Sequence, residues 1–264
     1  MKRKKLYIIL LLIILLFTFT GCDKMNPKTK ITVASYNVQC LSYGTQLISI
    51  SEEIKSINPD IIGIQELDKY TTRTGNTNQL ENLALMSGYK YFYYSKTIDF
   101  DGGEYGHGIM SKYPIKNFET KQFAIQGNEN RCFSRAEIEV NNETIVFYNT
   151  HLDFGGNMQT NQLSEIVDLA YQDEYAIITG DMNCVPSTYK HILEDKNLIS
   201  LNGGETFSNF INTCPEGEKS HEAIDNIIIS KNFDCYYDDN TQSNLIINKT
   251  ENSDHNMIYT HLEF

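Results

Sequence analysis

The stretch YAIITGDMN (175–183) decides how the rest of the sequence is interpreted. Its first part has the apolar run of a short strand that is buried on both faces of a sheet. The run stops at Asp181 and Asn183, and a carboxylate at the end of a buried strand needs solvent, a partner or a ligand. The stretch therefore predicts a β-sheet with reactive side chains at the end of one strand.

Other apolar strands carry the same kinds of polar side chain. They are Asn37 in ITVASYNV (31–38), Glu66 in DIIGIQE (60–66), Asn149 and His151 in TIVFYNTHL (144–152), Asp225 in AIDNIIIS (223–230), and Asp254 and His255 just before MIYTHLEF (257–264). Taken alone, each asparagine is an ordinary turn residue. Because a sheet gathers its strand ends along one edge, we expect the whole set to converge in one crevice.

Three segments between these strands have the apolar spacing of amphipathic helices. They run from Leu47 to Ile57, from Leu80 towards Gly88, and from Leu163 to Ala170. Hydrophobic residues make up 41% of the chain, which is enough to bury a sizeable core. No internal repeat or linker divides the sequence, so we expect one compact domain of mixed strands and helices over residues 31–264.

The polar set contains the groups that metal-assisted phosphoryl transfer needs. Magnesium prefers a few oxygen ligands and keeps several waters, so Glu66 with Asn37 and Asp254 would form a sparse metal site. The reaction also needs an activated water and neutralised charge on the phosphoryl oxygens. A histidine held by a carboxylate is a suitable base near neutral pH, and His151 and His255 are available for this role.

The N-terminal 21 residues have the pattern of an export signal. A basic start and an unbroken apolar run are followed by Gly21 and Cys22, and the run is short for a transmembrane helix. The segment resembles a bacterial lipobox, which implies a lipoprotein signal peptide over residues 1–21, a lipid on Cys22 and a tether over residues 22–30. An uncleaved N-terminal anchor is the alternative. In both cases we expect the domain on the extracytoplasmic face of the cell membrane.

The mature chain is strongly acidic. The full chain has a formal charge of −12, and residues 1–21 hold four basic and no acidic residues, which leaves 18 basic against 34 acidic residues and a charge of −16. Such a surface repels polyanions and lacks the basic face of most nucleic-acid binders. Five cysteines remain, with no paired CxxC spacing that would indicate a zinc ribbon.

The polar motifs form one ordered series: SYN (35–37), IQE (64–66), EYGHGIMSKYP (104–114), NTHL (149–152), GDMN (180–183), AIDNII (223–228) and SDH (253–255). In this order and at these spacings, the series resembles the endonuclease/exonuclease/phosphatase superfamily over nearly the whole mature chain. The resemblance implies an α/β (α+β) fold of the DNase I-like type, a four-layer sandwich of two mixed β-sheets flanked by helices. It also implies a phosphoric ester hydrolase that uses Mg²⁺ or Mn²⁺.

The resemblance assigns roles to the strand-end residues. Asn37 and Glu66, with Asp254 nearby, would serve the metal. Asp181 and Asn183 would hold the attacking water and the phosphate, so that Asn183 takes part both in catalysis and in substrate binding.

The same resemblance assigns the two histidines. Asp225 would orient His255, which would act as a base or stabilise the pentavalent phosphate. His151 would be the second imidazole and the candidate acid for the leaving group, as in the nuclease and sphingomyelinase branches of the superfamily.

Two further residues are implied by a more local likeness. Tyr105, in GGEYG, would donate a hydrogen bond to a phosphate oxygen. With TTRTG (71–75), this segment resembles a bacterial subgroup of poorly defined substrate. Within that subgroup Arg131 would be the cationic phosphate contact, and Arg135 competes with it for this role.

We therefore expect a monomeric, membrane-anchored, metal-dependent phosphoesterase of small or lipid-linked phosphodiesters or phosphomonoesters. The alternative enzyme is an extracellular metal-dependent nuclease, which the acidic charge disfavours because phosphate contacts supply much of the affinity for nucleic acid. A catalytically inactive binding lipoprotein is the alternative of another class. Such a protein should have lost at least one catalytic residue, and all of them are present.

The export signal generates a first prediction. Growth of an expressing bacterial host with a radioactive fatty acid should label the wild-type protein and not Cys22→Ser, because the substitution removes the sulfur that would carry the lipid. Autoradiography of the two immunoprecipitated proteins makes the measurement. Equal labelling of both would contradict the lipoprotein signal.

Overall fold

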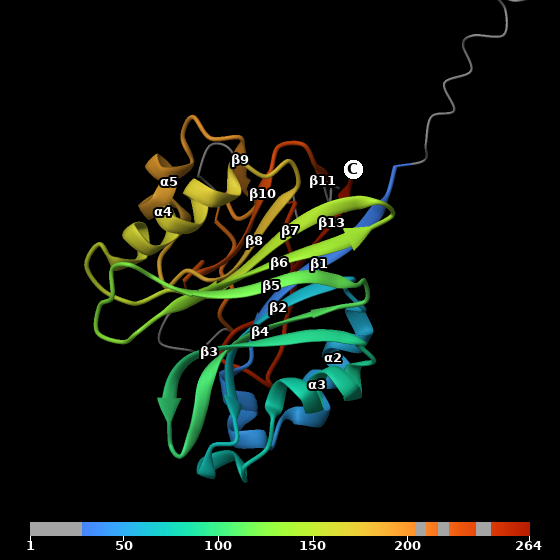
Figure 1. Ribbon diagram of the computed structural model, residues 1–264, viewed down its shortest axis with the longest axis vertical. Coiled ribbons are helices and arrows are strands. Elements are labelled where there is room, and N and C mark those ends of the chain that lie inside the picture. Colours follow the sequence, from blue (N-terminus) through green and yellow to red (C-terminus); the bar gives the residue numbers. More distant parts are fainter. Residues whose placement is uncertain (1–27, 204–209, 216–221, 236–243) are drawn as a thin grey trace, which may run out of the picture.

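A computed structural model describes residues 28–203, 210–215, 222–235 and 244–264 (Figure 1). The export signal and Cys22 lie outside the described residues. Within the described ranges, no helix is long and apolar enough to cross a membrane. Four cysteines of these ranges are free thiols, namely Cys40, Cys132, Cys184 and Cys235.

Seven strands make up the first sheet. In order across the sheet they are β11 (Asp234–Cys235), β13 (Met257–Glu263), β1 (Lys30–Asn37), β2 (Ile61–Lys69), β4 (Gly103–Ser111) and β3 (Tyr91–Phe100), and β12 (Ile246–Asn248) pairs with β13. β1 and β2 run parallel, whereas the other pairs are antiparallel, so the sheet is mixed.

Six strands make up the second sheet. In order they are β5 (Ile115–Gln122), β6 (Cys132–Val140), β7 (Glu143–His151), β8 (Ala176–Asp181), β10 (Asp225–Ser230) and β9 (Leu198–Ser200). Here β7 and β8 are the parallel pair. The second sheet is therefore also mixed, and its central strand β8 is the one that carries the GDMN motif.

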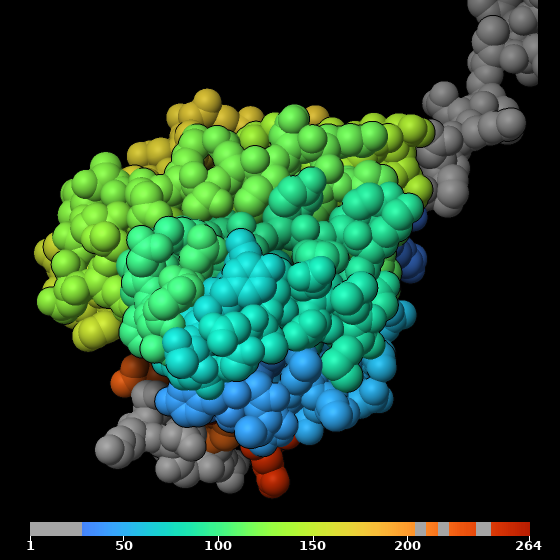
Figure 2. All heavy atoms as spheres, turned by 60° about the horizontal axis from the view of Figure 1, so that its bottom comes forward, coloured from blue at the N-terminus to red at the C-terminus, as the bar shows by residue number. Residues whose placement is uncertain are grey.

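The sheets pack face to face and the helices cover their outer faces (Figure 1). α2 (Leu47–Ile57) and α3 (Gln79–Ser87) pack on the first sheet, and α4 (Met158–Ala170) and α5 (Pro186–Leu193) pack on the second. Figure 2 shows the first of these outer faces, where residues of α2 and α3 are blue to cyan. A third apolar cluster fills the space between the sheets. This arrangement confirms the predicted four-layer sandwich.

Alternation along β1 shows how the sequence builds these layers. Ile31 and Val33 belong to the cluster between the sheets, whereas Ala34 and Tyr36 belong to the cluster under α2 and α3. Successive side chains of a strand point to opposite faces, so one strand supplies both layers. All four of these side chains are buried, which explains why the strand carries apolar residues on both of its faces.

Several elements were not expected from the sequence, among them the strand β5, the helix α5 and the short strands β9, β11 and β12. β5 has few apolar residues because it is an edge strand with mostly exposed side chains. α5 has eight residues and starts at Pro186, so it is too short to show a clear helical period. Two 3₁₀ segments, η1 (Gln39–Gly44) and η2 (Thr72–Thr74), also lie in stretches without periodicity.

A polar contact joins the two sheets near one end of the sandwich. Asn149 of β7 donates hydrogen bonds to the backbone oxygens of Ile64 and Gly108, at 3.1 and 2.9 Å, and accepts one from Gln65 at 2.6 Å. Gly63 gives it room, since a Cβ there would lie 2.4 Å from the Asn149 side-chain oxygen. Asn149 was expected in the crevice, but it is fully buried between the sheets and fixes their separation.

Candidate active site

The register of the second sheet places three of the predicted site residues side by side. β7 and β8 pair with His151 opposite Asp181, and β8 and β10 pair with Asp181 opposite Asp225. β7 and β8 end at these residues, whereas β10 starts at Asp225 and runs in the opposite direction. The three residues therefore lie along one edge of the sheet.

The first sheet contributes Asn37 and Glu66. Asn37 is the last residue of β1, but β2 continues beyond Glu66 to Lys69. The register of β2 against β4 shifts between Ile64 and Leu67, and Glu66 has a φ of 56°. Such a bulge breaks the alternation of side chains. It lets the Glu66 side chain meet Asn37, whose Nδ2 donates to Glu66 Oε1 at 3.0 Å.

The carboxylate of Asp181 lies at the centre of the site. Its Oδ2 accepts a hydrogen bond from Asn37 Nδ2 at 3.1 Å and lies 3.5 Å from His151 Nε2 and 3.6 Å from His255 Nε2. Its Oδ1 accepts a hydrogen bond from the backbone N–H of Asn183 at 2.9 Å. Asn183 has a φ of 50°, which asparagine tolerates better than most residues. Asp181 therefore contacts groups from both sheets.

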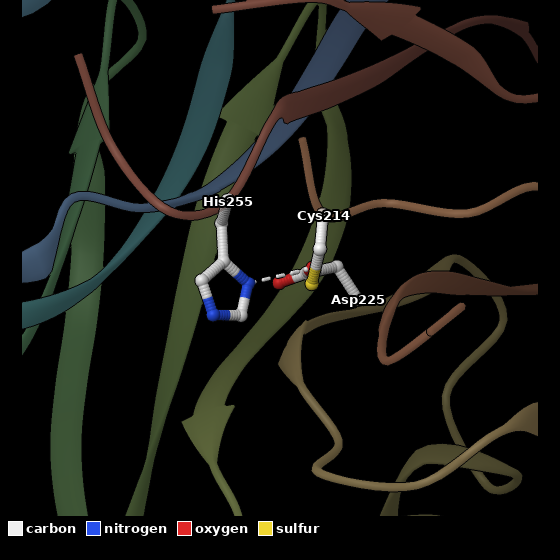
Figure 3. Close-up of side chains that lie close together, drawn as sticks. All are labelled: Cys214, Asp225 and His255. Atoms are coloured by element: carbon white, nitrogen blue, oxygen red, sulfur yellow. Dashed lines mark hydrogen bonds and ion pairs between the residues drawn. The ribbon is translucent and has the colours of Figure 1, made fainter. Parts of the chain in front are cut away.

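Asp225 and His255 form a buried pair beside this centre (Figure 3). His255 Nδ1 lies 2.8 Å from Asp225 Oδ2, which also accepts a hydrogen bond from Thr213 Oγ1 at 2.6 Å. Burial lowers the pKa of His255, but the charges of Asp225 and Asp181 outweigh it and raise the pKa to about 11. The imidazole is therefore protonated at neutral pH in this arrangement.

Burial moves the pKa values of the other two central groups in opposite directions. Burial raises the pKa of Asp181, and the positive charge of His255 opposes this shift. Burial lowers the pKa of His151 well below its ordinary value, and the charge of Arg131 lowers it further. His151 is therefore neutral, unlike His255, although both rings approach the same carboxylate.

Glu66 and Asp254 form the acidic part of the site. Burial raises the pKa of Glu66, the hydrogen bond from Asn37 lowers it, and the negative charge of Asp254 raises it again. Asp254 Oδ2 accepts a hydrogen bond from Gln39 Nε2 at 2.9 Å. Asn37 Oδ1 accepts one from the backbone N–H of Gln39 at 3.1 Å, so Asn37 faces the carboxylates with its nitrogen. Two carboxylates held by neutral amides are a donor set that suits a hard divalent cation.

Arg131 and Tyr105 border the site. Arg131 is only 4% exposed, and its Nε has no hydrogen-bond partner among the described residues. Its other end lies 2.9 Å from Glu129, whereas Arg135 pairs with Glu137 on the strand. A buried, unpaired N–H beside the site makes Arg131 the better phosphate contact of the two. Burial and the charge of Glu66 raise the pKa of Tyr105, so its hydroxyl keeps its proton.

Three contacts were not foreseen from the sequence. Ser253 Oγ donates to the backbone oxygen of Asn37 at 2.8 Å, and Thr213 holds Asp225 from 12 residues upstream. The Arg73 guanidinium pairs with buried Asp68 and lies 6.0 Å from the Tyr105 ring. Ser253 belongs to the SDH motif and Arg73 to TTRTG, whereas Thr213 lies in an irregular segment without any such signal.

Comparison with solved structures shows the same fold in distant proteins. An endonuclease/exonuclease/phosphatase from Beutenbergia cavernae DSM 12333 has a TM-score of 0.69 at 17% identity, over 89% of this chain and 72% of that one. A mannosyl-6-phosphatase from Bacteroides thetaiotaomicron VPI-5482 has a TM-score of 0.67 at 17% identity, over 89% and 100%. ANGEL2, a 2′,3′-cyclic phosphatase in complex with adenosine-2′,3′-vanadate, has a TM-score of 0.66 at 15% identity, over 90% and 97%.

Sequence comparison identifies the family directly. No curated protein matches the chain. The sequence profile of the Endonuclease/Exonuclease/phosphatase family matches residues 34–233, which include the second sheet and every site residue except Asp254 and His255. This chain therefore belongs to the endonuclease/exonuclease/phosphatase family, whose members hydrolyse phosphoester bonds.

Proposed function

We propose that the protein is a divalent-metal-dependent phosphoesterase that hydrolyses small phosphate esters outside the cytoplasm. The observation that carries this proposal is the setting of Asp181. Its carboxylate lies between the Nε2 atoms of His151 and His255, at 3.5 and 3.6 Å, and Asn37 links it to Glu66. A carboxylate, two imidazoles and an acidic metal-type site in contact with one another are the parts that hydrolysis of a phosphate ester requires.

Glu66 and Asp254 are the residues that would hold Mg²⁺ or Mn²⁺. The groups that donate hydrogen bonds to them are all neutral, so a cation would balance the two negative charges. These donors are the amides of Asn37 and Gln39, the thiol of Cys40 and the hydroxyl of Ser253. When bound, the ion would polarise the phosphoryl group and offset its charge. Asn37 also links the metal site to Asp181, because its amide nitrogen donates hydrogen bonds to both Glu66 and Asp181.

The remaining groups act on the water and on the phosphoryl oxygens. Asp181 has a raised pKa and can accept the proton of the attacking water. The backbone N–H of Asn183 holds its other oxygen, and the Asn183 side-chain amide donates to the backbone oxygen of Leu152 at 2.7 Å. His255 is an imidazolium and stabilises the negative charge of the pentavalent phosphate. His151 is neutral, so its ring would stabilise the leaving oxygen by a hydrogen bond and not by a positive charge.

The charge of the chain supports a small substrate. A formal charge of −12, or −16 without residues 1–21, repels long polyanions, whereas one phosphate group needs only the local charges of Arg131, His255 and the metal. Phosphate esters of sugars or inositols, or of lipid headgroups, fit this surface. The mannosyl-6-phosphatase among the structural neighbours acts on a substrate of the first kind.

The location is part of the same proposal. The basic start, the apolar run and Gly21-Cys22 support export and a lipid anchor on the extracytoplasmic face of the membrane.

The metal site generates a second prediction. EDTA should abolish hydrolysis by purified residues 23–264, and Mg²⁺ or Mn²⁺ should restore it. Glu66→Gln should need at least about tenfold more metal for the same rate, because it loses a charged oxygen ligand. Suitable substrates are bis-p-nitrophenyl phosphate, mannose 6-phosphate, inositol phosphates, sphingomyelin and plasmid DNA.

Glu119→Gln, on the exposed edge strand β5, is the matched control and should keep the wild-type metal requirement. Full activity in chelator would refute the proposed mechanism. Rapid cleavage of plasmid DNA with no turnover of the small esters would instead favour the extracellular nuclease.

The protonation states generate a third prediction. With ¹⁵N-labelled histidine and chelator present, NMR at pH 8 should show His255 doubly protonated and His151 neutral. The folded pKa of His255 lies above the ordinary value of about 6.5. The Asp225–His255 pair therefore stabilises the fold fully below about pH 6.5, and this contribution is lost as the pH rises towards 11.

Asp225→Asn should lower the pKa of His255, because it removes the nearest negative charge, and should leave His151 neutral. A neutral His255 in the wild type at pH 8 would contradict its role as a cation.

The contact between Asp225 and His255 generates a fourth prediction. Asp225→Asn and His255→Ala should each lower the single-turnover rate by about two to four powers of ten, the range for lost acid–base catalysis. The double variant should be scarcely slower than the slower single variant, because both substitutions disable one unit. Circular dichroism verifies that all three variants fold. Multiplicative losses would mean that the two residues act separately.

A further inference from the structure

Cys214 lies beside the Asp225–His255 pair (Figure 3). Its Sγ, a carboxylate oxygen of Asp225 and a ring nitrogen of His255 all lie within 4.8 Å of one another. The three side chains are 4%, 1% and 7% exposed, so the cluster is buried and shielded from bulk water. The mechanism proposed above uses Asp225 and His255 but gives Cys214 no part.

The position of Cys214 is fixed by its neighbour in the chain. Thr213 donates its side-chain hydroxyl to Asp225 at 2.6 Å and accepts a hydrogen bond from the Asp225 backbone N–H at 3.1 Å. The backbone N–H of Asn256 in turn donates to the Thr213 oxygen at 2.7 Å. These contacts join residue 213 both to β10 and to the segment that carries His255, so the thiol is held next to the pair.

We propose that Cys214, Asp225 and His255 bind a thiophilic divalent cation of the Zn²⁺ class, and that this ion inhibits the enzyme. A thiolate, an imidazole and a carboxylate are ligands that zinc prefers, and three protein ligands with a fourth open position are a common zinc arrangement. The metal site at Glu66 and Asp254 offers oxygen ligands, which suit magnesium. The two sites therefore select different ions, and the inhibition rests on the proposed phosphoesterase activity.

The distances allow such a site after small shifts. Zinc bonds of about 2.0–2.3 Å place neighbouring ligand atoms of a tetrahedral site about 3.3–3.7 Å apart. Atoms that now lie within 4.8 Å of one another therefore need to move by about 1 Å. On binding, the thiol of Cys214 and the ring nitrogen of His255 lose their protons to solvent, and the ion takes the place of the proton between His255 and Asp225.

Inhibition follows from the groups that the ion would occupy. A His255 ring bound to zinc is no longer the free imidazolium that stabilises the phosphate, and Asp225 no longer orients it. Magnesium leaves the pair intact because it has little affinity for a thiolate. The enzyme would then be active with magnesium and inhibited by a low concentration of zinc.

The first test measures hydrolysis at constant magnesium over a series of buffered free Zn²⁺ concentrations. Cys214→Ser should keep the basal rate and need at least about tenfold more zinc for half inhibition, because the thiolate ligand is lost. Cys184→Ser is the matched control, since Cys184 is a partly buried thiol near Asp181, and it should retain wild-type sensitivity. Equal zinc inhibition of wild type and Cys214→Ser would overturn the proposal.

The second test does not depend on turnover. Co²⁺ added to the wild-type protein should produce the near-ultraviolet charge-transfer absorption of a cobalt–thiolate bond, and Zn²⁺ should abolish it. Cys184→Ser should show the same band and Cys214→Ala should lack it. A wild-type protein without the band would overturn the site even if Cys214 variants fold poorly. The band in a protein that hydrolyses no ester would retain the site and reject the proposed function.

Discussion

The contact of the Asp181 carboxylate with groups from both sheets is the constraint on which the site depends. Asp181 belongs to the second sheet, but one of its oxygens contacts Asn37 from the first sheet and His255 from the segment leading into β13. The site therefore depends on how the two sheets pack. Asn149, which bonds across the sheets just below, keeps that packing at a separation where these contacts can form.

The site places several charged side chains in the protein interior, which lowers the stability of the fold. Asp181 and Asp225 are almost fully buried, and a buried carboxylate is costly without a partner. His255 serves both carboxylates, which explains why one imidazole carries the positive charge and the other does not. Glu66 and Asn183 add backbone strain, since both have positive φ values outside glycine. Strain and unbalanced charge at one edge are typical of a site organised for chemistry.

The sequence was sufficient to predict the longer strands, the helices α2, α3 and α4, and the convergence of the polar strand ends. The apolar runs of β1, β2, β7 and β8 are long enough to be recognised, and a sheet gathers its strand ends by geometry alone. Other features depend on contacts between distant segments, which no local pattern encodes. The bulge that directs Glu66 and the hydroxyl of Thr213 on Asp225 are of this kind. Asn149 shows the limit of the strand-end argument, because the same residue type at a similar place joins the sheets.

The direction of β1 determines how the molecule would be oriented on a membrane. β1 runs from Lys30 to Asn37, so its first residue lies about 25 Å from Asn37 and the site, the length of an eight-residue strand. The C-terminus is there too, since the backbone N–H of Thr29 donates to the Phe264 oxygen at 2.9 Å. A lipid on Cys22 would anchor the protein to the membrane by this end, through the tether of residues 22–30, which can span at most about 30 Å. The site would then lie at the end of the domain away from the bilayer, where it would meet dissolved esters in preference to the headgroups of its own membrane.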